Sequence, residues 1–368
     1  MRIAFIGQKG IPAKNGGVEK YVENLAINLA ASGQDVLVYN RRNYLPAQLQ
    51  EFKGVKIINL PGLRSKNLEA ISHTFLACLD VLFRKVDIIH FQSIGPASLM
   101  WLIKLLKPNT TIVFTFHCQD YYHQKWGFFA RRYLRFGERI GCLFADKIIT
   151  VSKELTEYAA REYKKDPIYI PNGANPVEKT PVREIRRWGL EEKNYIVYIG
   201  RLVRHKGVHY LIEAYKRLET DKKLVIVGEG SYTDDYVADL QKLTGDDNNI
   251  IFTGNQTGRI LSELYSNAYI FVQPSESEGL SIALLEAMAY KTACLVSDIR
   301  ANLEAIGPAG LVFANKDAND LSLKLQTALD NPEKIMEKAN EGFERVKREF
   351  NWRDISDKVL DVYKSLKK

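Results

Sequence analysis

The chain has 368 residues, of which 46% are hydrophobic, 11% aromatic and 26% charged. At about 100–200 residues per domain, this length predicts two domains, each large enough to bury a core. The composition excludes a disordered chain, a collagen-like repeat and a disulfide-stapled miniprotein. No apolar run approaches the ~18 residues that a membrane-spanning helix needs.

The net charge of +8 is spread unevenly along the chain. Residues 1–175 hold 24 Lys and Arg against 14 Asp and Glu, a balance of +10, whereas the remainder holds 28 against 30, a balance of −2. The excess positive charge of the first half is explained either by a solvated surface with no partner or by binding to an anionic membrane, a phosphorylated acceptor or a nucleic acid. The four cysteines have no paired spacing, which argues against a zinc site and a disulfide framework and suits a reducing cytoplasm.

Strands and helices alternate along the first half of the chain. Short apolar runs of this kind are typical of strands that are covered on both faces. We expect strands at Arg2–Ile6, Asp35–Tyr39, Val55–Leu60, Val86–Phe91, Thr110–Phe116, Lys147–Val151 and Ile168–Ile170. The segment Val18–Ala31 has the periodicity of an amphipathic helix, and Gly33 is its expected stop.

The segment Gly127–Phe144 is predicted to form an amphipathic helix in the basic half. At about 100° per residue, one face carries Arg131, Arg132, Arg135 and Arg139. The opposite face is apolar, and we expect it to pack on the domain core; it holds Phe129, Tyr133, Phe136, Ile140, Leu143 and Phe144. The arginines would then be free to contact an anionic membrane, with Phe128 dipping into the interface.

The second half repeats the alternation, with strands expected at Tyr195–Ile199, Leu224–Val227, Ile250–Phe252, Tyr269–Val272 and Ala293–Val296. The whole pattern predicts an α/β fold of two Rossmann-like parallel-sheet domains facing an interdomain cleft. The turn-rich stretch at 171–176 places the boundary, so that residues 1–173 and 174–351 form the two domains. An amphipathic helix over 352–368 is expected to pack back on the first domain.

A glycine-rich loop, residues 7–17, joins the first strand to the first helix. Such a turn offers backbone N–H groups and the positive end of a helix dipole to a phosphate. Its spacing is not Gly-x-Gly-x-x-Gly, and Asn40-Arg41-Arg42 lacks the acidic residue that holds an NAD ribose. An NADP-dependent reductase is therefore a weaker alternative function. The purely structural alternative is a tight turn that binds no ligand and needs glycine only for its backbone conformation.

Two motifs of the second half carry charges suited to a nucleotide. Arg201 and Lys206 flank a strand-to-helix loop, where they can clamp a pyrophosphate, although loop cations are commonly plain surface charges. Glu278 is predicted to lie at the N-terminus of a helix that begins near Gly279, and Glu286 two turns into that helix. Because Glu286 is surrounded by apolar residues, its carboxylate needs a polar partner. The diol of a ribose could supply it, and so could a Lys or Arg in a structural ion pair.

His117 follows the strand Thr110–Phe116. A histidine at the carboxyl end of a buried strand can contact a substrate hydroxyl or shift a proton, and it can equally be structural. The other histidines, His73, His90, His123, His205 and His209, show no metal-ligand spacing, so no metal site is predicted.

In order and approximate spacing, these motifs resemble the retaining GT-B enzymes of glycosyltransferase family 4, group 1. The resemblance covers essentially the whole chain, and His117–Trp126 is similar to the bacterial surface-polysaccharide branch. Where the family often has Gly-Phe-Gly, this sequence has Gly279-Leu280-Ser281.

The resemblance implies a role for each motif. Gly16 and Gly17 would lie near the donor diphosphate and the acceptor, and Arg201 and Lys206 would bind the diphosphate and stabilise it as it leaves. Glu286 would hold the ribose, and His117 would contact the sugar. The sugar would also be held by Glu278 and by the backbone N–H groups of Leu280, Ser281 and Ile282.

The expected function is transfer of a sugar from a nucleotide diphosphate sugar to a glycan acceptor, with UDP as the first choice of donor nucleotide. The acceptor is expected to be lipid-linked and to lie at the cytoplasmic face of a bacterial membrane. No metal or other cofactor is expected. A nucleotide-sugar 2-epimerase shares the two-domain architecture and stays an alternative. A basic nucleic-acid-binding protein is the alternative from another class, but the sequence has no recognisable reading module, so no nucleic-acid partner is expected.

Overall fold

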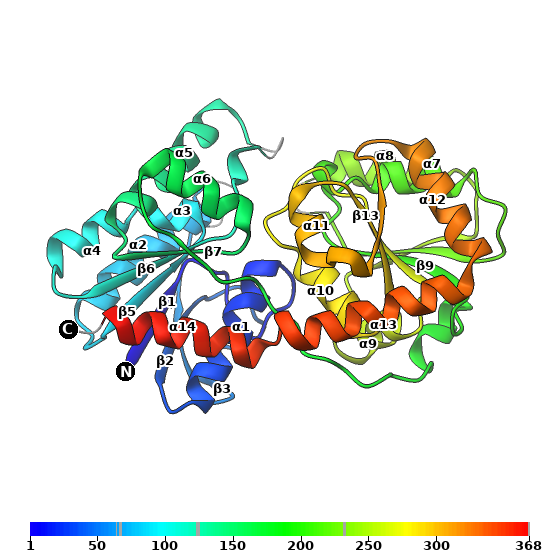
Figure 1. Cartoon of the computed structure of the whole chain (residues 1–368). Coiled ribbons are helices and arrows are strands. Elements are labelled where there is room, and N and C mark those ends of the chain that lie inside the picture. Colours follow the sequence, from blue (N-terminus) through cyan, green and yellow to red (C-terminus); the bar gives the residue numbers. More distant parts are fainter. Residues whose placement is uncertain (64, 66–67, 123–125, 231–232, 367–368) are drawn as a thin grey trace. The chain divides into compact units, whose positions relative to one another are not determined.

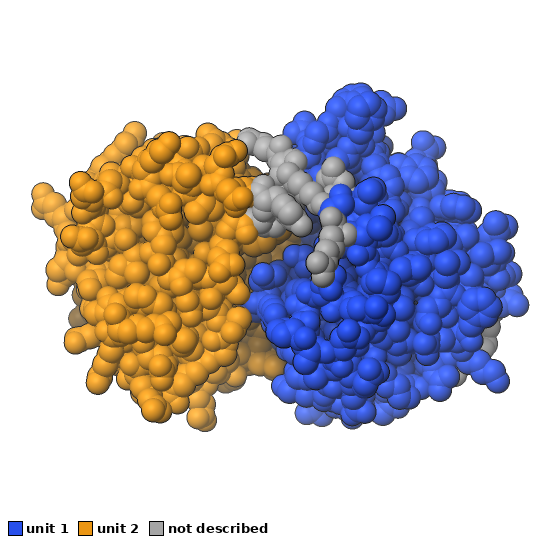
Figure 2. Space-filling view, turned by 180° about the vertical axis from the view of Figure 1, so that it is seen from behind, with its two compact units in different colours: residues 1–172, 352–368 blue, residues 173–351 orange. Residues whose placement is uncertain are grey.

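The computed structural model describes residues 1–63, 65, 68–122, 126–230 and 233–366 (Figure 1). The chain forms two compact units, which Figure 2 colours separately. Unit 1 comprises Met1–Asn172 with Trp352–Lys368, and unit 2 comprises Gly173–Asn351. His123, one of the histidines whose spacing predicts no metal site, lies outside the described residues.

Unit 1 is built on an eight-stranded sheet in the order β3-β4-β2-β1-β5-β6-β7-β8. Its strands are β1 (Arg2–Ile6), β2 (Asp35–Arg41), β3 (Glu51–Phe52), β4 (Val55–Leu60), β5 (Ile88–Gln92), β6 (Thr111–Phe116), β7 (Lys147–Thr150) and β8 (Ile168–Tyr169). All neighbouring pairs are parallel except β3 and β4. The strand order runs in opposite directions on the two sides of β1, which is the kind of switch point where open α/β sheets bind ligands.

The helices of unit 1 include one that follows unit 2 in the sequence. They are α1 (Gly17–Ala31), α2 (Glu69–Leu82), α3 (Ile94–Ala97), α4 (Met100–Leu106), η1 (Asp120–Tyr122), α5 (Phe128–Phe144), α6 (Lys153–Tyr163) and α14 (Trp352–Leu366). The last helix, α14, packs against α1, as Figure 1 shows. The Tyr21 and Trp352 rings approach to 5.7 Å, and the Tyr363 hydroxyl contacts Nδ1 of His90 at 2.6 Å.

Unit 2 is built on a six-stranded, fully parallel sheet in the order β11-β10-β9-β12-β13-β14. Its strands are β9 (Tyr195–Ile199), β10 (Lys223–Val227), β11 (Ile250–Gly254), β12 (Ile270–Gln273), β13 (Ala293–Ser297) and β14 (Leu311–Phe313). Its helices are η2 (Glu184–Trp188), η3 (Arg204–Lys206), α7 (Val208–Tyr215), α8 (Asp234–Thr244), α9 (Gly258–Ser266), α10 (Ile282–Ala289), α11 (Arg300–Ile306), η4 (Gly307–Ala309), α12 (Ala318–Asp330) and α13 (Pro332–Glu349).

The predicted fold class, two Rossmann-like parallel-sheet domains, is confirmed, but the structure adds detail that the sequence did not reveal. The edge strands β3 and β14 were not predicted, because two or three residues carry too little periodicity to stand out. The helix expected near Gly279 begins instead at Ile282, because the Ser281 side chain caps it by accepting a hydrogen bond from the Leu284 N–H.

The predicted packing of α5 is wrong. Most of the apolar face does not pack on the core, since Phe129, Phe136 and Leu143 are exposed by 86%, 50% and 43%, and only Tyr133 and Ile140 are half-buried. The buried sector is instead Leu134, Gly137, Glu138, Gly141 and Cys142. A Cβ atom on Gly137 would lie 2.1 Å from the Ile94 carbonyl oxygen, and one on Gly141 would lie 2.9 Å from the Phe114 ring. The two glycines therefore let α5 approach α3 and β6 more closely than larger residues would allow.

Candidate functional site

In unit 2, the connection from β9 to α7 carries the two predicted cations. Arg201 follows the strand, and Lys206 ends η3 directly before Gly207, whose φ is +69°. A Cβ atom on Gly207 would lie 1.9 Å from the Pro274 carbonyl oxygen, so only glycine lets this turn touch the loop that follows β12. That close approach places Lys206 beside Glu278.

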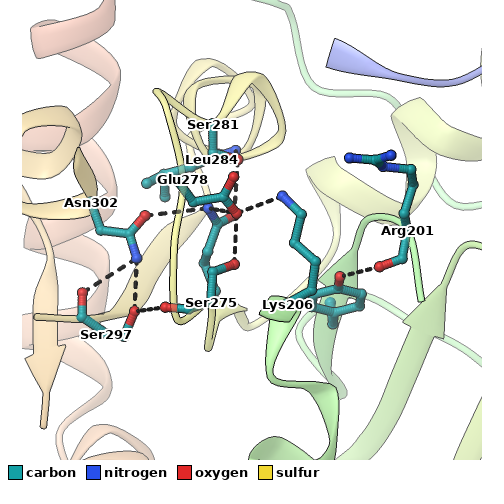
Figure 3. Close-up of polar contacts among 10 residues, drawn as sticks. Arg201, Lys206, Ser275, Glu278, Ser281, Leu284, Ser297 and Asn302 are labelled. Carbon is teal, nitrogen blue, oxygen red and sulfur yellow. Dashed lines mark hydrogen bonds and ion pairs between the residues drawn. The ribbon is translucent and has the colours of Figure 1, made fainter. Parts of the chain in front are cut away.

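Glu278 receives three donors on the same carboxylate oxygen. The Lys206 ammonium lies 2.5 Å from Oε1, the Ser275 hydroxyl donates at 2.7 Å, and the Gln273 side-chain amide donates at 3.2 Å (Figure 3). The Glu278 side chain is only 10% exposed. With Oε1 fully engaged, Oε2 is the oxygen through which this carboxylate can accept from a ligand.

A buried polar network holds the residues around Glu278. Ser281 donates to the side-chain oxygen of Gln273 at 3.0 Å, and the Gln273 amide also reaches Asn302 at 3.3 Å. Asn302 donates to the Ser297 hydroxyl at 2.9 Å, and that hydroxyl donates to the Ser275 carbonyl at 2.5 Å. Figure 3 shows this continuous chain of contacts leading to Glu278. The network fixes the Glu278 loop before any ligand arrives.

Arg201 is held by its backbone while its guanidinium is left available. The Tyr198 hydroxyl donates to the Arg201 carbonyl at 3.0 Å. The half-buried guanidinium makes no hydrogen bond or ion pair within the described part of the chain. A positioned guanidinium without a protein partner is suited to bind a phosphate group.

Glu286 lies one turn into α10, not two, because the helix begins at Ile282. It is half-buried, and its Oε2 accepts a hydrogen bond from the Tyr265 hydroxyl at 3.1 Å. Leu280 and Ser281 precede the helix, and the N–H groups of Ser281 and Ile282 belong to the first turn, where helical N–H groups have no intrahelical partner. The positive end of the α10 dipole thus lies next to Glu278.

In unit 1, His117 directly follows β6 and is buried. Its Nε2 contacts the side-chain oxygen of Gln92 at 2.8 Å, and the ring packs edge-on against Tyr21 at 4.8 Å. Burial lowers the pKa of His117 to about 4, so the imidazole is neutral at pH 7. Because Gln92 accepts the Nε2 proton, Nδ1 carries the lone pair that can accept from a substrate hydroxyl.

The glycine-rich loop of unit 1 is tied down by carboxylates from the first turns of α1. Glu19 accepts from the Lys9 N–H at 3.0 Å, and Glu23 accepts from the Ala13 N–H. Gly16 is the residue before α1, and Gly17 is the first residue of the helix. A Cβ atom on Gly17 would meet no atom within 4 Å, so the backbone here is open to a ligand.

The two groups of predicted residues belong to different units. Unit 2 holds the cation and carboxylate group of Arg201, Lys206, Glu278 and Glu286, and unit 1 holds His117, Gly16 and Gly17. The unit 2 group combines two cations and a helix N-terminus with acceptor oxygens, which suits a ligand having both anionic and hydroxyl groups. Among the residues that the structure describes, no group of three or more His, Cys, Asp or Glu is arranged to hold a metal ion.

Sequence reasoning missed the residues that orient the predicted ones: Gln92, Gln273, Ser275, Ser297 and Asn302. Gln92 and Gln273 end buried strands, and a polar residue at the carboxyl end of a parallel strand is a usable signal. Asn302 lies in α11, 24 residues beyond Glu278, and no local pattern connects the two.

Family models match both halves of the chain. "Glycosyltransferase Family 4" matches residues 15–178, and "Glycosyl transferases group 1" matches residues 183–345. An uncharacterized glycosyltransferase of Methanocaldococcus jannaschii, MJ1607, is 31% identical over 59% of this chain and 60% of its own length. The O-antigen chain mannosyltransferase B of Escherichia coli is 27% identical over 54% of this chain. The chain spans about 60% of the length of the first relative and 52% of the second.

Solved structures show the same fold. Sucrose-phosphate synthase from Thermosynechococcus elongatus superposes with a TM-score of 0.85 at 24% identity, covering 99% of this chain and 98% of that one. HepE of Anabaena, solved in complex with UDP-glucose, gives 0.83 at 17% identity over the whole of both chains. The two family models together match most of the chain, which therefore belongs to the glycosyltransferases, with a family 4 domain over residues 15–178 and a group 1 domain over residues 183–345.

Proposed function

We propose that this protein is a retaining glycosyltransferase that moves a hexosyl group from a nucleotide diphosphate sugar to a glycan acceptor. The observation that carries the proposal is the group formed by the free Arg201 guanidinium and the Lys206–Glu278 pair at the strand ends of unit 2. It supplies positive charge for a diphosphate beside a carboxylate oxygen for sugar hydroxyls.

In the proposed reaction, Arg201 and Lys206 bind the donor diphosphate and Glu286 accepts hydrogen bonds from the ribose. Oε2 of Glu278 and the N–H groups of Leu280, Ser281 and Ile282 hold the donor sugar. The bond between the anomeric carbon and the diphosphate oxygen breaks, and the acceptor oxygen bonds to that carbon on the same face. The acceptor proton passes to the departing phosphate, whose charge the two cations stabilise without a metal ion.

On unit 1, neutral His117 orients the sugar through Nδ1, and Gly16 and Gly17 admit the diphosphate and the acceptor. UDP is the first choice of donor nucleotide, and the UDP-glucose complex of HepE supports it. The O-antigen mannosyltransferase relative supports a role in bacterial polysaccharide synthesis. The acceptor in this proposal is lipid-linked and lies at the cytoplasmic face of the membrane.

A donor screen tests the proposal. The full chain is incubated with UDP-, dTDP- and GDP-sugars, release of nucleoside diphosphate is measured, and the anomeric configuration of the product is determined by NMR. We expect turnover with one nucleotide class, an unchanged anomeric configuration and full activity in EDTA. Inversion, or inhibition by EDTA that Mg²⁺ reverses, would contradict the proposed mechanism.

A pair of variants locates the donor site. Glu286→Ala should weaken nucleotide diphosphate binding by about 2–4 kcal/mol, because two hydrogen bonds to a charged group are lost. Glu333→Ala removes the same charge from an exposed position of α13 and should leave binding unchanged. Equal affinities for the two variants, measured by calorimetry, would refute the ribose role of Glu286.

We also propose that unit 1 attaches to an anionic membrane through α5. Within the described residues, no helix has the length and apolar character to cross a membrane. The exposed surface of α5 combines Phe128, Phe129, Phe136 and Leu143 with four exposed arginines, which are Arg131, Arg132, Arg135 and Arg139. Phe129 is more exposed than Phe128, 86% against 67%, so it joins Phe128 as an inserting residue.

Charge makes this attachment testable. Each arginine near an anionic leaflet contributes about 1 kcal/mol, and salt screens that contribution. The wild type should sediment with anionic vesicles at low salt and much less with zwitterionic ones. Replacing all four arginines with Gln should remove that difference and leave nucleotide binding intact. Unaltered sedimentation of the quadruple variant would exclude this surface.

A further inference from the structure

A cavity in unit 1 lies beside the exposed face of α5 and has no part in the proposed transfer reaction. It has a volume of about 590 Å³ and is lined by residues of η1, α5 and α6. Its lining is aromatic and charged: four tyrosines (Tyr121, Tyr122, Tyr158 and Tyr163), the carboxylates Glu138 and Glu162, and the cations Arg135, Arg139 and Lys164. We call it the α5–α6 cavity.

Glu138 is the unusual member of this lining. It is 1% exposed, and its Oε1 accepts hydrogen bonds from Tyr158 at 2.7 Å and Tyr163 at 2.6 Å. Its Oε2 is buried and has no hydrogen-bond partner within the described residues. A buried carboxylate oxygen without a partner is costly, and a ligand hydroxyl would satisfy it.

Positive charge and aromatic rings surround this carboxylate. Arg135, Arg139 and Lys164 are all exposed, and the Arg135 guanidinium lies 5.1 Å from the centre of the Tyr121 ring. Within the described residues, Glu138 is hydrogen-bonded by tyrosines and not by these cations. The three cations outnumber the two carboxylates of the lining, Glu138 and Glu162, so the cavity offers a ligand net positive charge. Two guanidiniums and an ammonium favour a phosphate group.

The cavity also borders apolar surface. Leu143 lines the cavity and is 43% exposed. Phe136 and Phe129 precede it at seven-residue intervals, so the three form one exposed stripe along α5. A ligand seated in the cavity could therefore have an anionic, hydroxylated head and an apolar chain that follows the helix.

We propose that the α5–α6 cavity binds the headgroup of a membrane phospholipid whose phosphodiester carries a hydroxylated substituent, of the phosphoglycerol type. The arginines hold the phosphodiester, Oε2 of Glu138 accepts from a glycerol hydroxyl, and the acyl chains lie against the Leu143–Phe136–Phe129 stripe. This inference rests on the membrane association proposed above and adds headgroup selectivity to it, which charge attraction alone does not supply.

Two lipids of equal charge separate selectivity from simple attraction. Vesicles of zwitterionic lipid are doped with the same mole fraction of either phosphatidylglycerol or phosphatidylmethanol, whose phosphodiester has the same charge and no hydroxyl. We expect the full chain to partition about fivefold more strongly to phosphatidylglycerol, as one added hydrogen bond allows. Equal binding to both lipids would overturn the headgroup site and leave the membrane association standing. Binding to neither would overturn both.

Variants place the selectivity in the cavity. Glu138→Met should reduce the preference to near equality, whereas Glu154→Met, which removes the same charge from an exposed position of α6, should keep it. Leu143→Trp narrows the cavity without touching Glu138, and it should also abolish the preference even if Glu138→Met fails to fold. Leu105→Trp, at an exposed leucine of α4 outside the lining, is its control. A preference that survives Leu143→Trp would assign the selectivity to another surface.

Discussion

Three donors converge on one oxygen of Glu278, and this arrangement gives the two oxygens different tasks. Oε1 receives Lys206, Ser275 and Gln273, so the protein itself fixes that half of the carboxylate. The ammonium of Lys206 is thereby held next to the carboxylate that we propose binds the donor sugar. In the proposed reaction, Lys206 serves both Glu278 and the diphosphate, and its charge matters most as negative charge develops on the leaving group.

Replacing Lys206 tests this shared role. Lys206→Ala should lower turnover at saturating donor by about 2–4 kcal/mol in barrier height, the usual cost of losing one electrostatic stabiliser. Lys316→Ala is a matched control, because Lys316 pairs with Glu276 at 3.2 Å but is 57% exposed. The measurement is kcat for both variants. Normal kcat in Lys206→Ala would show that the leaving group is stabilised by other residues.

Gln273 and Ser275 both connect Glu278 to the rest of the network. Gln273→Leu removes the donor to Glu278 and the acceptor of Ser281, so donor affinity should fall by about 1–3 kcal/mol. Gln241→Leu, on the exposed face of α8, should leave donor affinity unchanged. Calorimetric titration of both variants with the donor nucleotide measures the two affinities. Equal affinities would show that the network supports the fold without contributing to donor binding.

At the scale of elements, α14 joins the end of the chain to unit 1. The Tyr363 hydroxyl is buried against His90, whose other nitrogen lies 2.6 Å from the Thr115 hydroxyl. Tyr363→Phe leaves Nδ1 of His90 without its hydrogen-bond partner, which should lower the free energy of unfolding by about 1–3 kcal/mol. For a unit of this size, that loss lowers Tm by about 2–4 °C per kcal/mol. Calorimetry should show the shift in one unfolding transition, while Tyr122→Phe, which is 62% exposed, should show none.

Another element, α5, shows how glycines decide which face of a helix is buried. The sequence contains Gly137 and Gly141 one turn apart, and these small residues sit against the Ile94 backbone and the Phe114 ring. Close approach along that line places the phenylalanines on the solvent side, although they are the more hydrophobic residues. The exposed stripe is therefore a consequence of tight packing elsewhere on the same helix.

For the whole molecule, acid should destabilise unit 1 first. Burial lowers the pKa of His73 to about 4, of His90 to about 3 and of His117 to about 4, and all three belong to unit 1. In the unfolded chain a histidine has a pKa of about 6.5. Below that pH the unfolded state binds more protons than the folded state, so the free energy of unfolding falls as the pH falls.

The size of the acid effect follows from these shifts. At pH 5 each buried imidazole should cost on the order of 2 kcal/mol relative to pH 7. The check is calorimetry at both pH values, in which the unit 1 transition should move to lower temperature by more than the unit 2 transition. Coincident shifts, or no shift between pH 7 and pH 5, would contradict burial of neutral histidines in unit 1.

The sequence by itself determined the fold class and the candidate donor-site motifs. Alternating strands and helices are local patterns, and most short apolar runs between turn signals in this chain are strands. Arg201, Lys206 and Glu278 were found because they lie where strands end, and the carboxyl ends of parallel strands carry the ligand sites of α/β proteins.

Only the tertiary structure decided how these residues are held. Asn302 reaches the Glu278 network from α11, Gln92 sets the tautomer of His117 from a neighbouring strand, and the buried sector of α5 depends on Ile94 and Phe114. Each of these contacts joins residues far apart in the sequence, and the free energy of such a contact depends on packing that no local periodicity encodes. For that reason the sequence named the candidate residues of the site, while the packing of the folded chain selected the free oxygen of Glu278, the tautomer of His117 and the exposed face of α5.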